Sequence, residues 1–331
     1  MVTVLLTGVG GAAGIGAIGS LRRTTDHEVV GVDMDPEAAG LFMADAAAQV
    51  PPAAADGWVD TMVRIVRQHA VDVIVPTVDE ELPRLPELRA ALPEVGIVAP
   101  RQEVIEVARD KYRTSRVLRE AGHDVPRTWL GTAADEVPDD AYPLIGKPRT
   151  GRGSRGIERL DTPADLDTFL AAADDLDAVV VQERIDGPEY TTSVVTTGDG
   201  RLIGIVPKEA IEKQGSTVRG VTRRAPAVDA ACRGIQETLD PAGPINVQQI
   251  LSEGTAYTIE INPRFSSTAC LTVAAGVDEL DLLIRDAAGE TVESTGDYES
   301  GTHLIRYLDH VIVDEARLEH TADGSPMEPT Q

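Results

Sequence analysis

The sequence predicts a mixed α/β and α+β fold that begins with a doubly wound domain. Residues 2–6 form an apolar segment that runs into the glycine-rich stretch TGVGGAAGIG and a helical pattern, and a second apolar strand follows. This βαβ order continues to residue 99, which indicates a parallel sheet with helices on both faces. From residue 179 onward, strand-like segments follow one another across short turns such as Gly198-Asp199-Gly200, which indicates antiparallel pairing.

Composition and charge exclude several classes of protein. The chain has 331 residues, 42% of them hydrophobic, which is enough for two or three folded domains. Its net charge of −25 excludes a nonspecific nucleic-acid binder and argues against binding to anionic lipid. No segment reaches the ~18 apolar residues of a transmembrane helix, and the start MVTVLLTG lacks the basic region of a signal peptide. The sequence therefore predicts a soluble, cytoplasmic protein.

Lysine is nearly absent from the chain. The acidic, lysine-poor and aromatic-poor composition leads to the hypothesis that the protein is halophilic, adapted to a salt-rich cytoplasm. If the surface has lost its lysines, those that remain are candidates for specific functions. They are Lys111, Lys147, Lys208 and Lys213. The two cysteines, Cys232 and Cys270, lie far apart without CxxC spacing, so neither a zinc site nor a disulfide scaffold is indicated.

The glycine-rich stretch has two interpretations. Gly8, Gly11 and Gly14 have the TGxxGxxG spacing of a dinucleotide-binding loop, in which Asp33 would bind the ribose of NAD(P). Alternatively, the glycines only allow a tight turn from a strand into a helix. Dehydrogenases and epimerases that use this spacing need a Tyr-x-x-x-Lys pair, and this chain has none. We therefore favour the turn and keep NAD(P) binding as the alternative.

The rest of the first domain continues the alternation of helix and strand. The sequence predicts a helix over 58–68, a buried strand over 71–76, a proline-interrupted helix over 82–92 and a short strand over 96–99. Asp79, Glu80 and Glu81 follow the strand at its carboxyl end, where such sheets bind ligands. In so acidic a chain, however, a solvated loop is the favoured interpretation of these carboxylates.

The next segment brings two lysines close to a glycine- and arginine-rich loop. The sequence predicts one helix over 102–122, which carries Lys111, and a strand over 142–148, which carries Lys147. The loop RTGRGSRG follows at 149–156 and contains three glycines and three arginines. Its backbone N–H groups and guanidinium groups suit a phosphate. The alternative is a mobile hairpin tip with incidental charge.

The remaining elements follow in order. We expect an acidic helix over 161–173 capped by Asp161 or Thr162, strands over 179–183, 190–196 and 202–207, a polar basic segment over 208–224, helices over 267–275 and 279–287, a strand-like segment over 303–313 and a loose tail from 314. These elements divide the chain into a first domain (1–100), a second segment with the glycine-rich loop (101–185), a third with the hairpin described next (186–313) and the tail (314–331).

A hairpin near the end of the third segment can bind a hard cation. Residues 245–251 and 256–262 are its two strands, and their alternation points Gln248, Glu260 and Asn262 into one space. These side chains offer the oxygen ligands that Mg²⁺ prefers, but too few to enclose it, so positions stay open for phosphate oxygens. The alternative is a polar strand face in contact with solvent.

The order of these parts resembles the ATP-grasp superfamily, and within it the single-unit members similar to carbamoyl phosphate synthetase. The resemblance rests on a helix lysine, a strand lysine with a glycine-rich loop, a QE-x-x-x-G-x-E segment and the combination N-x-Q…E-x-N-x-R, and it covers residues 2–288. It implies a Rossmann-like pre-ATP-grasp domain followed by a two-lobed ATP-grasp domain.

The resemblance also implies roles for individual residues. Phosphate and nucleotide contacts fall on Lys111, Lys147, Arg149, Gly151, Gly153, Ser154, Gly156, Glu183, Arg184, Ile185 and Glu189. The backbone at Glu183 and Ile185 would contact adenine, and Glu189 would bind the ribose. Metal ligands fall on Gln248, Glu260 and Asn262, and catalytic or substrate contacts on Arg264, Lys208, Lys213 and Arg219. Many ligases have Asp or Glu in place of Gln248, so a second Mg²⁺ would bind less tightly here.

The implied chemistry is the activation of a carboxylate by ATP, with one or two Mg²⁺ ions for which Mn²⁺ can substitute. ATP would phosphorylate the carboxylate to an acyl phosphate, and an amine, ammonia or a related nucleophile would displace phosphate. No glutaminase-like Cys–His pair is evident, so ammonia would come from solution or from a partner chain. Relatives are often dimers, which makes a homodimer one of the expected assemblies. The alternatives are an NAD(P)-dependent oxidoreductase or epimerase and a non-catalytic, ATP-binding regulatory module.

Overall fold

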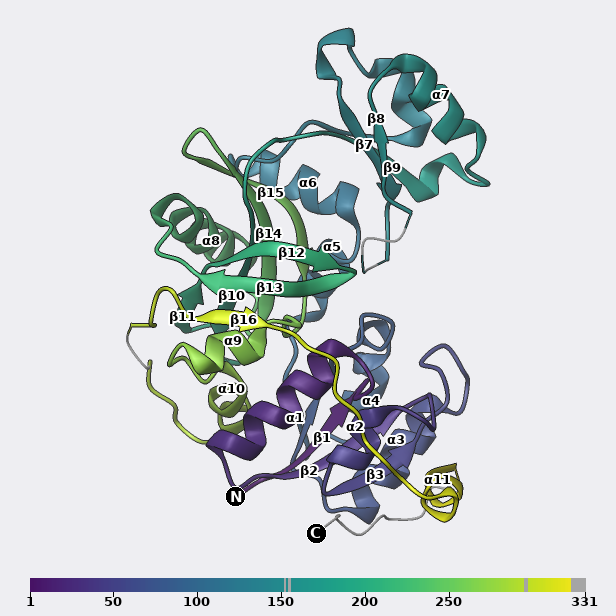
Figure 1. Ribbon diagram of the computed structural model, residues 1–331, viewed down its shortest axis with the longest axis vertical. Coiled ribbons are helices and arrows are strands. Elements are labelled where there is room, and N and C mark those ends of the chain that lie inside the picture. Colours follow the sequence, from purple (N-terminus) through teal and green to yellow (C-terminus); the bar gives the residue numbers. More distant parts are fainter. Residues whose placement is uncertain (152, 154–155, 295–296, 323–331) are drawn as a thin grey trace.

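The computed structural model describes residues 1–331 except 152, 154–155, 295–296 and 323–331, and its strands form three sheets (Figure 1). The first is parallel, in the order β3-β2-β1-β4-β5. Its strands are β1 (Thr3–Thr7), β2 (Glu28–Asp33), β3 (Ala46–Gln49), β4 (Val73–Val75) and β5 (Gly96–Ile97). Apolar side chains of these strands enter two cores, one on each face of the sheet. This is the predicted doubly wound domain.

Helices from both ends of the chain cover this sheet. One face packs against α1 (Ala12–Thr24), α2 (Ala39–Met43) and α10 (Glu279–Ala287), and the other against α3 (Trp58–Gln68), α4 (Leu85–Ala91) and α5 (Gln102–Ala108). Helix α10 thus completes the core of a domain that lies more than 180 residues earlier in the sequence. The first domain is therefore joined to the rest of the chain by an apolar core.

The second sheet is antiparallel and forms a separate lobe (Figure 1). It contains β6 (Thr128–Leu130), β7 (Leu144–Pro148), β8 (Glu158–Leu160) and β9 (Val179–Glu183), and α7 (Pro163–Ala171) covers it. The single helix predicted over 102–122 is wrong: α5 ends at Ala108, and α6 (Lys111–Glu120) begins a new axis. Asp110 causes the break, because its carboxylate accepts the N–H groups of Tyr112 and Arg113, each at 3.0 Å, and caps α6.

The third sheet is antiparallel and holds the predicted hairpin. Its order is β15-β14-β10-β12-β13-β16, and β11 also pairs with β10. The strands are β10 (Glu189–Thr196), β11 (Leu202–Val206), β12 (Lys208–Gln214), β13 (Ser216–Thr222), β14 (Ile245–Ser252), β15 (Thr255–Asn262) and β16 (His303–Ile305), with α8 (Pro226–Leu239) and α9 (Ala269–Ala274) beside them. The polar segment 208–224, for which no regular structure was predicted, is mainly the β12–β13 hairpin.

The carboxyl-terminal part of the chain differs from the expected loose tail. Only residues 303–305 of the strand-like segment pair as a strand, and residues 315–322 form α11 (Glu315–Ala322) rather than irregular chain. Val313 and Leu318 pack against the apolar core of the first domain. We call residues 303–322 the strap, because they run from the third sheet across the first domain (Figure 1).

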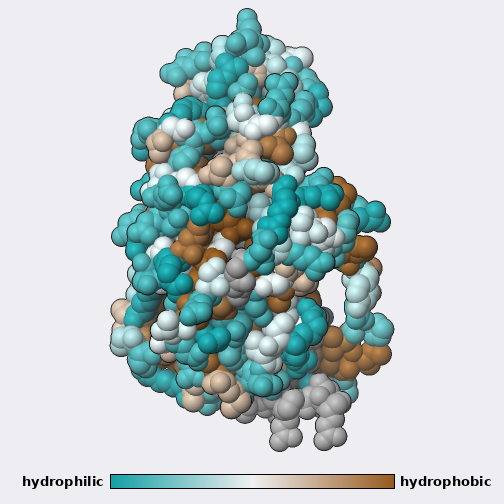
Figure 2. All heavy atoms as spheres, turned by 90° about the vertical axis from the view of Figure 1, so that its left-hand side faces the viewer, coloured by the Kyte–Doolittle hydropathy of each residue, from teal (hydrophilic) through white to brown (hydrophobic). Residues whose placement is uncertain are grey.

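Short elements complete the chain. The 3₁₀ helices are η1 (Leu82–Arg84), η2 (Gly131–Glu136), η3 (Asp139–Ala141) and η4 (Leu176–Ala178). No helix in the described part of the chain is long and apolar enough to span a membrane. The face shown in Figure 2 is largely hydrophilic over the second lobe, with apolar side chains visible in the middle of the molecule and at its lower right. This distribution fits a chain with a net charge of −25.

Candidate active site

Two adjoining cavities lie between the first domain and the third sheet. The first has a volume of about 190 Å³ and is lined by Gly8, Ala12 and Ala13 of the first domain and by residues of β10, β12, β13, β14 and β15. The second has about 200 Å³ and lies between Asp79 and Lys111. Glu260 and Asn262 line both cavities. They therefore stand in the wall that the two spaces share.

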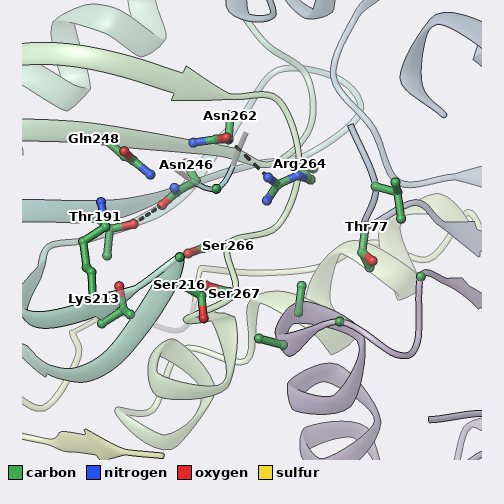
Figure 3. Close-up of a pocket in the computed structure, with 18 of the residues that line it drawn as sticks. Thr77, Thr191, Lys213, Ser216, Asn246, Gln248, Asn262, Arg264, Ser266 and Ser267 are labelled. Carbon is green, nitrogen blue, oxygen red and sulfur yellow. Dashed lines mark hydrogen bonds between the residues drawn. The ribbon is translucent and has the colours of Figure 1, made fainter. Parts of the chain in front are cut away.

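The β14–β15 hairpin places its amide and carboxylate side chains on the cavity. Gln248 pairs with Glu260 and Asn246 with Asn262 in the strand register, so the four side chains share one face. Figure 3 shows Gln248, Asn246 and Asn262 around the first cavity, with Thr191 of β10 beside them. Thr191 Oγ1 donates to Asn246 Oδ1 at 2.8 Å. Gln248, Glu260 and Asn262 are thus brought together, and Asn246 and Thr191, which the sequence did not single out as ligands, join them.

Lys111 reaches Glu260 from the first turn of α6. Its Nζ lies 3.4 Å from Glu260 Oε1 and donates to the carbonyl oxygen of Gly151 at 2.9 Å. The Lys111 side chain is only 9% exposed, because the glycine-rich loop covers it. The Lys111 ammonium group is therefore held between Glu260 of the hairpin and the loop that was expected to contact phosphate.

Lys147 is buried between the second lobe and the hairpin. Its Nζ donates to Gln182 Oε1 at 2.8 Å and to the carbonyl oxygen of Ile259 at 3.4 Å. Burial lowers the pKa of Lys147 to about 8, against the opposing effect of the Glu260 charge. A phosphate beside this amine would stabilise its charged form and raise that pKa.

Arg264 is held by a carboxylate of the first domain. Its Nε and one terminal nitrogen donate to Asp79 Oδ2 at 3.0 and 2.6 Å, and the same nitrogen reaches Asn262 Oδ1 at 3.3 Å. Figure 3 shows the bond to Asn262. The interpretation of the acidic loop as solvated is wrong for two of its three carboxylates: Asp79 is paired, and Glu81, 5% exposed, accepts a hydrogen bond of 2.5 Å from Thr7 Oγ1. Glu80 is exposed, as that interpretation expects.

The residues expected to bind adenosine line the junction of the second lobe and the third sheet. The Glu183 carboxylate pairs with Arg127 Nε at 3.2 Å, and the N–H of Glu183 donates to the Arg127 carbonyl. Arg184 pairs through its side chain with Asp186, and Ile185 is half-buried. Glu189, the expected ribose contact, accepts a hydrogen bond of 2.6 Å from Lys213 Nζ. Lys213 lines the first cavity, so this pair connects the nucleotide region with that space.

The glycine-rich loop of the second lobe contributes mainly backbone. Gly151, Gly153 and Gly156 have φ of +108°, +72° and +65°, values that favour glycine. Gly153 lines the first cavity and Gly151 the second. Ser154, expected to contact phosphate, lies outside the described residues, as do the arginines at 152 and 155.

Three basic residues of the predicted set are placed differently from expectation: Arg149, Arg219 and Lys208. Arg149 is bound by Asp110 at 2.7 Å and Asp177 at 2.8 Å, and these contacts raise its pKa. Arg219 has a side chain that is 64% exposed and pairs with Glu212 at 3.4 Å on the strand surface. Neither side chain lines the cavities. Arg149 therefore stabilises the loop, and Arg219 is removed from the substrate contacts.

Lys208 is also removed, because it lies in the core. It is 1% exposed, and its Nζ donates to Ser193 Oγ at 2.6 Å and Thr272 Oγ1 at 2.8 Å. Ser193 Oγ in turn donates to the buried carboxylate of Glu279 at 2.8 Å. Burial lowers the pKa of Lys208 to about 8, and Glu279 opposes this effect. The side chain links β12 to α9 and α10 and faces neither cavity.

The amino-terminal glycine loop turns toward the first cavity. Gly8 has φ of +60°, and a Cβ at this position would lie 2.3 Å from Val78 Cγ2, so only glycine fits. Asp33, the expected ribose contact in an NAD(P) site, instead accepts the N–H groups of Gly10 at 2.8 Å and Asp35 at 3.0 Å. The carboxylate thus closes its own loop, and Gly8 and Gly11 line the same cavity as Gln248.

Comparison with known proteins assigns the two parts of the chain to family models. Residues 108–268 match the ATP-grasp domain, and residues 4–99 match the PylC-like, N-terminal domain. The chain belongs to the ATP-grasp superfamily. Together the two matches include every residue that lines either cavity. The resemblance inferred from the motifs is therefore confirmed.

Similar sequences are large chains of carbamoyl phosphate synthase. The protein from Caldanaerobacter subterraneus subsp. tengcongensis is 27% identical over 227 residues, which are 63% of this chain and 21% of the relative. The protein from Thermomicrobium roseum is 27% identical over 226 residues, 62% of this chain and 21% of the relative. The ATP-grasp chain thus spans about a fifth of the length of the curated relatives it matches.

Similar solved structures confirm the predicted fold. Biotin carboxylase from Campylobacter jejuni, in a β-γ-ATP complex, gives a TM-score of 0.72 at 17% identity over 92% of this chain and 74% of that chain. L-amino acid ligase from Bacillus licheniformis gives 0.68 at 18% identity over 88% and 75%. Carboxyaminoimidazole ribonucleotide synthase from Aspergillus clavatus, complexed with ATP, gives 0.68 at 19% over 90% and 80%. At these identities the likeness concerns the ATP-grasp fold alone.

Proposed function

We propose that the protein is an ATP- and Mg²⁺-dependent ligase that joins a carboxylate to an amine or related nucleophile through an acyl phosphate. The observation that carries this proposal is the convergence of two lysines, one carboxylate and one arginine from separate elements. Lys111 of α6 lies 3.4 Å from Glu260 of β15, and buried Lys147 of β7 donates to the carbonyl oxygen of Ile259, the residue before Glu260. Arg264 follows β15 and lines the first cavity. Such a set suits the transfer of a phosphoryl group.

The two lysines would bind the phosphates of ATP. Lys111 has a neighbouring carboxylate at 3.4 Å, and Lys147 has none within ion-pair distance among the described residues. A phosphate would therefore supply the charge that the buried Lys147 lacks, and the backbone amides of Gly151 and Gly153 could close over it. Glu189 and the 183–185 backbone would hold ribose and adenine, which requires Lys213 to share Glu189 with the ribose.

The hairpin fits a magnesium ion held jointly with the nucleotide. Gln248, Glu260 and Asn262 offer hard oxygen atoms, of which only Glu260 carries a full charge. The described residues contain no group of three or more His, Cys, Asp or Glu side chains that could bind a metal alone. Phosphate oxygens would thus complete the coordination. When bound, the metal would neutralise charge on the phosphates and orient them.

Arg264 would stabilise the charge that develops during transfer. Its guanidinium lines the first cavity and is fixed by Asp79 and Asn262, so no reorientation is needed when the substrate arrives. A carboxylate oxygen of the substrate would attack the γ-phosphorus, ADP would leave, and the acyl phosphate would react with the nucleophile to release phosphate. The protein needs no covalent nucleophile for these steps.

The relatives support this class of chemistry without naming the substrate. The sequence relatives are carbamoyl phosphate synthases, and the structural relatives include an L-amino acid ligase and a biotin carboxylase domain bound to MgADP and bicarbonate. A nicotinamide-dependent enzyme is less well supported, because Asp33 is committed to its own loop. A regulatory module without turnover would bind ATP but release no ADP.

Nucleotide binding and ADP release test the proposal. We expect MgATP, but not NAD, to raise the melting temperature, and we expect bicarbonate or a member of a panel of amino acids and small carboxylates to stimulate ADP release. Glu260→Ala should abolish this release while the fold is retained. Glu253→Ala, in the exposed β14–β15 turn, is the matched control. Stabilisation by NAD alone, or an active Glu260→Ala protein, would refute the proposal.

A further inference from the structure

The amino terminus of α1 opens into the first cavity. Ala12 and Ala13, in the first turn of this 13-residue helix, line the cavity, and Figure 3 shows α1 across that space from Gln248 and Asn262. The N-cap residue Gly11 makes no side-chain capping bond, and the first turn contains no acidic residue. The free N–H groups and the helix dipole therefore give this end of the cavity a partial positive charge.

Two hydroxyl-bearing residues, Thr217 and Ser267, line the same cavity as the amino terminus of α1. Thr217 is 5% exposed and lines the cavity, and within the described chain its hydroxyl makes no hydrogen bond. Ser267, another lining residue, lies beside α1, since its carbonyl oxygen is 3.9 Å from a Cβ built at Gly16. Arg306 of the strap donates to the backbone carbonyls of both Thr217 and Ser267. Thr217, Ser267 and the amino terminus of α1 thus belong to the lining of one cavity.

The charges around this end favour an anion. The cationic side chains that line the cavity are neutralised, Lys213 by Glu189 and Arg264 by Asp79. Arg306, behind Thr217 and Ser267, pairs with no carboxylate of the described residues and binds only backbone oxygens. Glu260, a carboxylate that lines the same cavity, is paired with Lys111. In a chain with a net charge of −25, the uncapped helix end and an arginine without a carboxylate partner behind Thr217 and Ser267 therefore favour an anion.

We propose that the amino terminus of α1, Thr217 and Ser267 form a subsite for a carboxylate group of the small-molecule substrate that does not itself react. The inference rests on the proposed ligase function, in which the reacting group lies at Arg264. A singly charged carboxylate suits this subsite better than a phosphate, because N–H and hydroxyl groups line it rather than cationic side chains.

Ala13→Asp tests the subsite, with Ala13→Asn as the matched neutral control. The aspartate places a carboxylate on the same N–H groups, and an acidic residue in the first turn favours the helix, so the variant should fold. Succinate is titrated calorimetrically into the full chain with MgADP bound, at constant ionic strength. We expect saturable binding to the native protein and to Ala13→Asn, and binding at least about tenfold weaker to Ala13→Asp because of charge repulsion.

A second pair of variants and a neutral probe make the test independent of one substitution. Thr217→Val should weaken succinate binding and Thr217→Ser should retain it, whereas succinamide should bind no better to the native protein than to Ala13→Asp. Equal succinate affinities in Ala13→Asp and Ala13→Asn, or no saturable binding to the native protein, would overturn the subsite. Failure of the ligase proposal is separate, since it would appear as loss of Mg-nucleotide binding in every protein tested.

Discussion

Replacement of Asp79 by Asn tests whether the first domain positions Arg264, the proposed catalytic arginine. Asp79 Oδ2 accepts two bonds from Arg264, at 3.0 and 2.6 Å, and the two side chains are only 15% and 13% exposed. The substitution leaves a guanidinium that is largely shielded from water without its counter-charge, although the amide oxygen can still accept one bond. Because loss of one partner of a buried pair costs about 3–5 kcal/mol, and one bond survives, we expect a loss of about 2–3 kcal/mol in the free energy of unfolding.

The effect on function should be larger than the effect on nucleotide binding. The proposed MgATP contacts are Lys111 and Lys147 rather than Arg264, so the affinity for MgATP should change little. Turnover should fall about a hundredfold, because a displacement of Arg264 by about 1 Å is enough for such a loss. Denaturant unfolding, nucleotide titration and ADP release measure the three quantities, with the exposed Asp56→Asn as the control.

A double-mutant cycle isolates the pair. Asp79→Asn and Arg264→Gln should each destabilise the protein, and the double variant should lose less than the sum, with a coupling of about 1–3 kcal/mol. Additive losses, or an Asp79→Asn protein with native turnover, would show that the carboxylate does not position Arg264.

Two further predictions concern the buried lysines. The pKa of Lys147 is lowered to about 8, and phosphate binding favours the charged amine, so the affinity for MgATP should fall as the pH rises through about 8. The Lys147→Met protein should bind MgATP weakly at every pH. Calorimetric titrations measure both affinities, and a native affinity that does not change with pH would contradict this role. Lys208→Met leaves the buried Glu279 without its cation and should reduce the free energy of unfolding by about 3–5 kcal/mol. Glu279→Gln in the same chain should restore most of that loss, and denaturant unfolding that shows no restoration would rule out the charge pairing.

Strong local patterns made much of the fold predictable. The glycine spacing and the apolar strand after residue 1 predict the βαβ opening, and helix α3 has the predicted bounds, Trp58–Gln68. The alternation in β14 and β15 correctly predicts which side chains share a face, because a strand has a fixed period of two. The single helix over 102–122 is wrong because the Asp110 cap competes with helix continuation, and periodicity alone does not reveal such a cap.

The candidate site combines both kinds of information. Gln248, Glu260 and Asn262 were chosen from one short hairpin, and Lys111 and Lys147 from the resemblance together with the scarcity of lysine. Asn246 could have been found from the same strand alternation, since it precedes Gln248 by two residues on the same face. Asp79 carried only the signal of its place at the carboxyl end of a strand, and this was outweighed because one acidic loop among many in this chain looks like solvated surface.

The sequence by itself determined the order of the elements, the face of the hairpin and the superfamily, since each depends on local spacing or on motifs a few residues long. Only the tertiary structure decided which charges are paired. Lys208 was expected at the substrate and lies in the core beside Glu279, Arg149 was expected at phosphate and is bound by Asp110 and Asp177, and Asp79 is joined to Arg264 across 185 residues. Such pairs depend on contacts between elements that lie far apart in the sequence. Folding likewise brings the uncapped end of α1 to the cavity that the β14–β15 hairpin lines.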